Sequence, residues 1–162
     1  MTSLHTLLTL AAPTLEHVCD IAVTIAAPVE VGTTVFGLRR MIPITGGSVK
    51  GPRMNGKILA GGADFQLIVG GGTQAHLDAR YVIELDDGTR VFVQNAAVRV
   101  ASLENSQKIM KGIAVDPSQI YFRCQPKMEA SSDHWAWLSE SQFIGTGVRQ
   151  PDGVFISFYR VV

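Results

Sequence analysis

The chain has 162 residues, of which 46% are hydrophobic and 17% are charged. This balance excludes an intrinsically disordered chain, and the length fits one folded domain with a core of its own. Lysine and arginine together number 14, as do aspartate and glutamate, so no net charge draws the protein to nucleic acid or to an acidic membrane surface.

The cysteines and the N-terminus narrow the class of protein further. Cys19 and Cys124 lie far apart in sequence, with no CxxC pair and no zinc-type histidine spacing, so we expect reduced thiols and no metal site. The first positively charged side chain is Arg39, so the N-terminus lacks the basic region of a secretory signal. The apolar run at residues 7–12 is too short to span a bilayer. We therefore expect a cytoplasmic protein that does not act at a membrane.

Short stretches rich in β-branched and aromatic residues follow an N-terminal arm. Residues 1–14 are mildly apolar without a clean period, so we expect an arm or a short helix ahead of a single domain at 15–162. Pro43 indicates an edge position or a bulge in its strand, and Asp86-Asp87-Gly88 is the strongest hairpin turn. The predicted strands cover residues 18–25, 35–44, 47–50, 56–60, 64–69, 74–85, 90–94, 120–124, 142–148 and 154–162.

Helical signals are few. Ser102 begins a short predicted helix that Gly112 ends, and residues 131–138 are expected to form a capped helical turn. Eight or more short strands with one or two short helices predict an all-β protein, built as an antiparallel barrel or a sandwich. The sequence has no dinucleotide fingerprint, phosphate-binding loop or GxSxG elbow, so we expect no cofactor and no catalytic triad.

Five blocks of sequence carry a family resemblance. They are residues 37–47, residues 61–65, residues 77–81 with Asp86-Asp87-Gly88, residues 115–118 leading into 121–123, and residues 135–138. Taken in order, they resemble the DUF3237 family, whose members are also named UPF0311 proteins, from about Leu15 to the C-terminus. The resemblance implies a single antiparallel β-barrel similar to those of allene oxide cyclase and dirigent proteins. In such barrels a lumen without a cofactor shapes a reactive small molecule, and some family members look like tailoring cyclases of natural-product pathways.

The chain departs from the family's pattern at four positions. Phe65 stands where the family usually has Trp, Trp135 where it has Tyr, and Ser139 where it has Asn. Met128 replaces a usual aromatic residue. We expect these changes to affect the shape of the pocket and the identity of the substrate more than the fold.

Two predicted strands carry polar side chains at alternate positions, where they share one face. Asp64 and Gln66 lie two residues apart, as do Asp78 and Arg80, so a curled sheet would aim all four into one lumen. Burial and a like charge would raise the pKa of one carboxyl, and Arg80 would lower that of its neighbour, which gives an acid and a base. We therefore predict Asp64, Asp78 and Arg80 as catalytic residues and Gln66 as a substrate contact. The alternative is that this face is solvated and carries ordinary surface pairs.

Two arginines are further candidates for substrate binding. Arg123 shares parity with Tyr121 on a predicted strand, and an inward Arg123 would bind an anionic group of the substrate together with Tyr121. Alternatively, Arg123 pairs with Glu129 at the rim of the barrel. Arg40 is predicted as a substrate contact with the same ambiguity.

Aromatic residues near the C-terminus complete the candidate site. His134, Trp135 and Trp137 are predicted to contact the substrate from a tight turn, where one tryptophan would offer a π face to a developing cation. The alternative is a hydrophobic plug. Tyr81 lies on the opposite face from Arg80 and is expected in the core.

These features predict a cofactor-independent cyclase or isomerase that acts on a small apolar oxygenated molecule by acid and base catalysis in the lumen. An example is the intramolecular addition of a hydroxyl group to an alkene. The competing prediction is a barrel that binds a small molecule without changing it, as a carrier or a sensor. Related barrels often associate through their outer faces, so we also expect a homo-oligomer.

Overall fold

The computed structural model describes residues 10–162, so most of the predicted N-terminal arm lies outside the described residues. Residues 10–14 form no helix or strand and are exposed. The elements that follow are β1 (Leu15–Ile25), β2 (Val29–Thr34), β3 (Gly37–Lys50), β4 (Gly56–Ile58), β5 (Gly62–Val69), η1 (Gly70–Gly72), β6 (Gln74–Leu85), β7 (Arg90–Val100), α1 (Leu103–Met110), η2 (Pro117–Gln119), β8 (Tyr121–Ala130), η3 (Asp133–Leu138), β9 (Phe143–Gln150) and β10 (Gly153–Val161), where η denotes a 3₁₀ helix.

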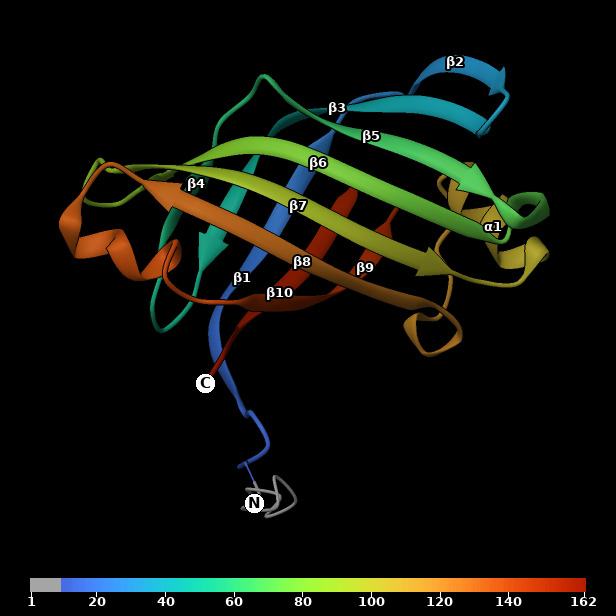
Figure 1. Ribbon diagram of the computed structural model, residues 1–162. Coiled ribbons are helices and arrows are strands. Elements are labelled where there is room, and N and C mark those ends of the chain that lie inside the picture. The colour runs from blue at the N-terminus through green and yellow to red at the C-terminus, as the bar shows by residue number, and fades with distance from the viewer. Residues whose placement is uncertain (1–9) are drawn as a thin grey trace, which may run out of the picture.

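The strands close into an antiparallel barrel (Figure 1). The order around the barrel is β1, β10, β9, β8, β7, β6, then β4 with β5, then β3, and β3 pairs with β1 again, which gives eight positions. β4 and β5 lie end to end between β3 and β6 and together fill one position. β4 pairs with residues 47–49 of β3, and β5 pairs with residues 38–44. The predicted all-β barrel is therefore confirmed.

Strand β3 changes its neighbour on one edge at Pro43. β2 pairs with β3 as far as Met41, and β1 pairs with β3 from Ile44 onward, so Pro43 lies in the gap between them. Proline has no backbone N–H to donate, and it falls where the ladder on this edge is interrupted. The Pro43 carbonyl still accepts a hydrogen bond from the N–H of Ala26, at 2.9 Å. This arrangement agrees with the irregularity predicted at Pro43.

Three strands end later in the chain than predicted. β7 continues to Val100, β8 continues past Pro126, and β9 continues to Gln150. Pro126 pairs with Asn95 of β7, whereas β9 pairs with β8 only at residues 123–124, so this proline lies where one edge of β8 carries no ladder. The structure also adds β2, which among the described residues pairs with β3 alone.

The helix α1 begins and ends where Ser102 and Gly112 were predicted to place its ends. The Ser102 hydroxyl accepts a hydrogen bond from the N–H of Asn105, and the helix ends before Gly112, whose φ is 72°. No helix within residues 10–162 has the length and apolar character needed to cross a lipid bilayer.

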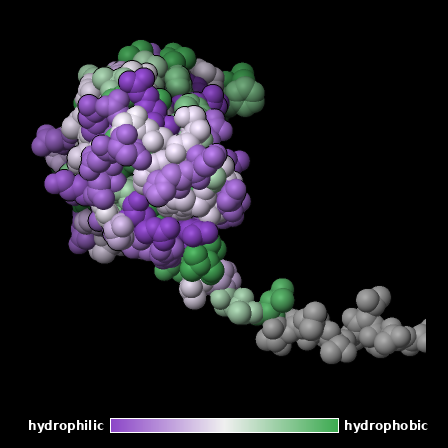
Figure 2. All heavy atoms as spheres, turned by 90° about the vertical axis from the view of Figure 1, so that its left-hand side faces the viewer, coloured by the Kyte–Doolittle hydropathy of each residue, from purple (hydrophilic) through white to green (hydrophobic). Residues whose placement is uncertain are grey.

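The interior of the barrel divides into two parts. A large apolar cluster includes Leu138 of η3, and its most buried side chains include Phe158, Ile21, Met54 and Ile83. Seen from the η3 end, the surface is mainly hydrophilic or neutral (Figure 2). Further along the barrel, a smaller apolar cluster around Phe122 borders a cavity.

Candidate functional site

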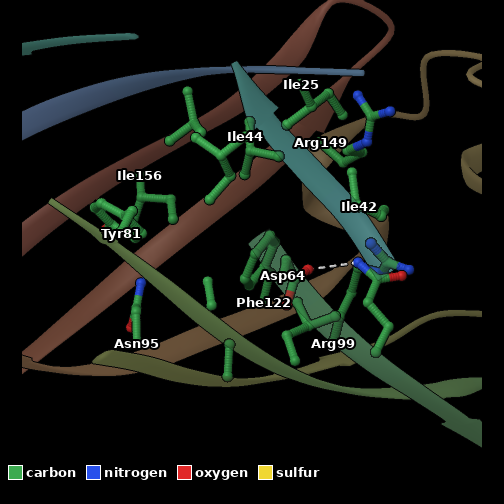
Figure 3. Close-up of a pocket in the computed structure, with 16 residues that line it drawn as sticks. Ile25, Ile42, Ile44, Asp64, Tyr81, Asn95, Arg99, Phe122, Arg149 and Ile156 are labelled. Atoms are coloured by element: carbon green, nitrogen blue, oxygen red, sulfur yellow. Dashed lines mark hydrogen bonds between the residues drawn. The ribbon is translucent and has the colours of Figure 1, made fainter. Parts of the chain in front are cut away.

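A cavity lies inside the barrel and is lined by side chains of β1, β3 and β5 to β10 (Figure 3). The centre of a water molecule can occupy about 60 Å³ of it, several times the roughly 10–15 Å³ that one water requires. Most of the wall is apolar. Polar side chains are confined to two regions, which we call the charged end (Asp64, Gln66, Arg99 and Arg149) and the neutral polar end (Tyr81 and Asn95).

Strand β5 aims the acidic group of the charged end inward. Gln66 and Ile68 are buried, whereas Phe65 is 48% exposed, so the inner face of β5 holds Asp64, Gln66 and Ile68. Alternate residues of a strand point to opposite faces, which is why Asp64 and Gln66 line the cavity together.

Hydrogen bonds fix both oxygens of this carboxyl group. Oδ2 of Asp64 accepts from Nε2 of Gln66 at 2.6 Å, and Oδ1 accepts from the backbone N–H of Asp78 at 3.1 Å. Burial raises the pKa of Asp64, while the bond from Gln66, the charges of Arg99 and Arg40, and the bond from Asp78 oppose part of the rise. The carboxyl group is thus easier to protonate than an exposed aspartate.

Arg99 lies on β7, which is separated from the β5 strand of Asp64 by β6 alone. It is 6% exposed and lines the cavity, and its guanidinium makes no side-chain hydrogen bond within residues 10–162. Burial and the charges of Arg40 and Arg149 together lower the pKa of Arg99 to about 10, although the charge of Asp64 opposes part of this shift. Arg99 therefore carries a buried positive charge without a hydrogen-bonded partner.

Two more arginines border the charged end. Arg149 is half-buried, and its Nη1 donates to the carbonyl of Gly153 at 2.9 Å. Arg40 does not line the cavity itself but stands behind Gln66, where its Nε donates to Oε1 of that side chain at 2.9 Å. Its Nη1 lies 3.8 Å from the exposed carboxylate of Glu30. Burial lowers the pKa of both arginines.

The neutral polar end is built by Tyr81 of β6 and Asn95 of β7, each 4% exposed. Neither the Tyr81 hydroxyl nor Oδ1 of Asn95 has a hydrogen-bond partner in the described part of the chain. Burial raises the pKa of Tyr81, and the neighbouring Asn95 side chain opposes only part of the rise, so the phenol stays neutral at physiological pH. Figure 3 shows these two residues on the other side of the cavity from the arginines, with Asp64 and Phe122 between.

Strand β6 turns Asp78 and Arg80 away from the cavity, which contradicts their prediction as lumen residues. Their side chains are 41% and 55% exposed, and Nη2 of Arg80 lies 3.3 Å from Oδ2 of Asp78. Ala79 and Tyr81 take the inner face instead, because the register places Ala79 directly opposite Asp64 and paired residues share a face. Asp78 and Arg80 instead form an ordinary surface pair, which was the alternative prediction.

Strand β8 likewise places Tyr121 and Arg123 outside, because Phe122 and Cys124 occupy its inner face. The Arg123 guanidinium stacks over the Tyr121 ring at 5.1 Å and donates to Oγ1 of Thr146 at 3.0 Å. Neither the predicted substrate contact nor the alternative pair with Glu129 describes Arg123.

The aromatic turn lies at a distance from the cavity. Nε1 of Trp135 donates to Asp87 at 2.8 Å, in the turn that precedes β7. This strand begins at Arg90, and Arg99 lies near its other end. At about 3.3 Å per residue, Arg90 and Arg99 are roughly 30 Å apart. The exposed His134 packs edge-on against Trp135, with ring centroids 5.1 Å apart.

Trp137 agrees with the alternative prediction for this turn, a hydrophobic plug. Its ring lies under the guanidinium groups of Arg53 and Arg160, at 4.9 and 5.6 Å, and it packs against Phe143. None of His134, Trp135 and Trp137 lines the cavity, so the structure contradicts their prediction as substrate contacts there.

Sequence reasoning missed Asn95, Arg99 and Arg149 because the predicted strands ended at residues 94 and 148. Asn95 and Arg99 continue the alternation of the buried Val91 and Val93, and extending that pattern would have placed them inside. The four departures from the family's pattern were expected to reshape the pocket. None of them lines the cavity; they are Phe65, Met128, Trp135 and Ser139.

The residues that line the cavity suit proton transfer and anion binding better than metal binding. Asp64 is the one acidic side chain among them. In the described part of the chain no three or more His, Cys, Asp or Glu side chains are placed to hold a metal ion. A buried carboxyl with a raised pKa next to guanidinium groups can exchange a proton with a bound molecule and orient its oxygen atoms.

Known proteins share this architecture. A UPF0311 protein of Rhodopseudomonas palustris strain TIE-1 is 41% identical over 152 residues, which span 93% of this chain and 99% of the relative. The crystal structure of a conserved protein of unknown function from Rhodopseudomonas palustris has a TM-score of 0.88 at 36% identity and covers 95% of this chain and 100% of that one. The structure of an enzyme from Penicillium herquei has a TM-score of 0.69 at 19% identity, over 95% and 98% of the two chains, and shows a shared fold alone. The family model described as a protein of unknown function (DUF3237) matches residues 13–161, and this chain belongs to that family.

Proposed function

We propose that this protein is a cofactor-independent cyclase or isomerase that moves a proton within a small oxygenated molecule bound in the barrel. The observation that carries the proposal is Asp64, a buried carboxyl whose pKa is raised inside an otherwise apolar cavity. Such a group is protonated at a higher pH than an exposed aspartate, and it can act first as an acid and then as a base. The Penicillium herquei protein is described as an enzyme, so this barrel architecture is compatible with catalysis.

The chemistry needs one carboxyl group where two were predicted. In the addition of a hydroxyl group to an alkene, protonated Asp64 gives its proton to one alkene carbon while the hydroxyl oxygen bonds to the other. The proton lost by that oxygen returns to the Asp64 carboxylate, so the product is an isomer of the substrate. Arg99 and Arg149 replace Arg80 in orienting oxygen atoms, and the apolar wall holds the substrate folded, which raises the effective concentration of the reacting groups.

The first prediction compares two aspartates with opposite surroundings. Asp64→Asn removes the titrating group, and we expect it to lower turnover by about 10²–10⁴-fold. Asp78→Asn changes an exposed side chain and should leave turnover within about twofold. Liquid chromatography with mass detection, run on a panel of hydroxylated alkenes in D₂O, measures the isomer and the single deuterium that the acid step introduces. Unchanged turnover in Asp64→Asn, with both variants folded by circular dichroism, would rule the mechanism out.

A second candidate function is a carrier or sensor that returns its ligand unchanged. It is favoured by the hydrogen bonds to both Asp64 oxygens, 2.6 and 3.1 Å long, which suit a permanent carboxylate that positions its neighbours. The same incubation separates the two functions, because a carrier yields no isomer and introduces no deuterium.

A further inference from the structure

The two ends of the cavity make different demands on a ligand. At the neutral polar end, the Tyr81 hydroxyl can donate a hydrogen bond and Oδ1 of Asn95 can accept one, yet both atoms lack a partner in the described part of the chain. Both side chains are more than nine-tenths buried and line the cavity. Buried polar atoms are rarely left unpaired, so this end is suited to a group that accepts from Tyr81 and donates to Asn95. A hydroxyl group does both, whereas a carbonyl or an ether can only accept.

The charged end has more positive than negative charge. Two guanidinium groups, those of Arg99 and Arg149, line it against the single carboxyl of Asp64. Arg40, which also faces the exposed Glu30, stands behind Gln66. Both oxygens of Asp64 already accept hydrogen bonds, and Arg99 has no hydrogen-bonded partner within residues 10–162. A planar anion such as a carboxylate matches the fork of a guanidinium group and would offset this charge.

The wall between the two ends is apolar. Ile44, Ala79, Ala97, Phe122 and Ile156 line it. The part of the ligand that lies between its polar groups must therefore be hydrocarbon, and the small free volume favours a compact or flat body.

We infer that the ligand of this cavity is a hydroxy acid: an anionic group at Arg99 and Arg149, an apolar body along the wall, and a hydroxyl group between Tyr81 and Asn95. This inference names the class of substrate for the proposed function. It rests on that proposal only in taking the cavity as the binding site, because recognition at two ends does not require Asp64 to transfer a proton.

Three aromatic probes test the two ends separately. 4-Hydroxybenzoate carries both groups, benzoate lacks the hydroxyl, and 4-hydroxybenzyl alcohol lacks the anion. Isothermal titration calorimetry at neutral pH should give the tightest binding for 4-hydroxybenzoate, with each single deletion weakening it about tenfold or more.

Matched variants assign each loss to its end. Tyr81→Phe should weaken 4-hydroxybenzoate about tenfold and leave benzoate unchanged, whereas Arg99→Met should weaken both acids and leave the alcohol unchanged. Arg80→Met, which removes an exposed arginine, should bind all three probes as the parent does. Equal affinities for the three probes, or losses that do not follow the deleted group, would overturn two-ended recognition, as would absence of saturable binding for 4-hydroxybenzoate.

The Asp64→Asn variant separates this inference from the proposed catalysis. Removing the carboxylate leaves the arginines less neutralised, so 4-hydroxybenzoate should bind at least as tightly as to the parent even where turnover is lost. Intact two-ended binding with normal turnover in this variant contradicts the catalytic proposal alone. One-ended binding with lost turnover contradicts the hydroxy acid alone.

Discussion

Asp64 and Asp78 lie on neighbouring strands, and the pleat places their side chains on opposite faces of the sheet. Asp64 is enclosed, and burial raises its pKa, whereas Asp78 shares solvent with Arg80. The two residues still meet, because the backbone N–H of Asp78 holds Oδ1 of Asp64. The same residue type thus provides the proposed acid on one strand and a backbone hydrogen-bond donor on the next.

Asp64 should make the stability of the protein depend on pH in an unusual direction. Its pKa is higher in the folded chain than the ordinary value of 3.8, so between the two values the folded state holds more protons than the unfolded state. The stabilisation it contributes is present below the ordinary value and is lost as pH rises through the raised pKa. We expect the unfolding free energy of the parent, minus that of Asp64→Asn, to fall as pH rises. The total fall should be about 1.4 kcal/mol for each tenfold difference in the acid dissociation constant of Asp64 between the unfolded and folded states.

Urea titrations at a series of pH values measure this difference, and a constant loss of hydrogen bonds in the variant cancels from its slope. Glu84→Gln is the control of opposite sign, because hydrogen bonds from Lys57 and Arg90 lower the pKa of the half-buried Glu84. Its contribution is present above the ordinary value of 4.5 and is lost as pH falls through the lowered pKa. A flat or rising difference for Asp64→Asn would contradict the environment described for this carboxyl.

At the scale of the element, β3 shows what sequence patterns can and cannot define. Its proline and its alternating residues predicted a strand with an irregularity, and both are present. The register of β5 against β6 decides which residues face the cavity, and it depends on how the chain turns through η1. Shifting that register by one residue would exchange Ala79 for Asp78 on the inner face, and a local pattern does not encode this choice.

The same limit explains the errors in the candidate site. Strand parity correctly paired Asp64 with Gln66, because both lie on one strand. It failed for Arg99, because hydrophobic alternation along β7 gives way to polar residues where the strand enters the charged end. A polar side chain on an inner face interrupts the hydrophobic alternation by which a strand is recognised, so the predicted strand ends there. The residues that line a polar cavity are therefore the ones that this pattern misses.

Gly47 is where β3 approaches β1 too closely for a side chain. Its φ is 152°, and a Cβ atom would collide with the carbonyl oxygen of Ala22. We expect Gly47→Ala to destabilise the barrel by several kcal/mol, because backbone of two paired strands must separate. Gly61→Ala is the matched control, with φ at 106° and no atom within 4 Å of the added Cβ, and it should cost only about 1–2 kcal/mol of backbone strain. Chemical denaturation compares them, and equal losses would refute the steric reason.

At the scale of the whole molecule, stability and function occupy different parts of the barrel. The part near η3 is filled by side chains such as Leu138 and Phe158, which are almost completely buried and contribute hydrophobic stabilisation. The charged end instead gathers arginines whose charges oppose one another. Such repulsion destabilises the folded state, and an anionic ligand that relieves it gains affinity in return.

Arg99→Met should therefore raise stability while it weakens the binding of anionic ligands. The substitution keeps a side chain of similar length and leaves Asp64 its hydrogen bonds from Gln66 and Asp78. It ends the repulsion of Arg99 with Arg40 and Arg149, which together outweigh the attraction to Asp64 that is also lost. A gain on the order of 1 kcal/mol would raise Tm by about 2–4 °C for a chain of this length. Arg80→Met should change neither Tm nor binding. Differential scanning calorimetry without ligand measures the shift. A Tm several degrees below that of the parent would mean that Arg99 stabilises the ligand-free barrel, which contradicts its assignment as an unneutralised anion-binding group.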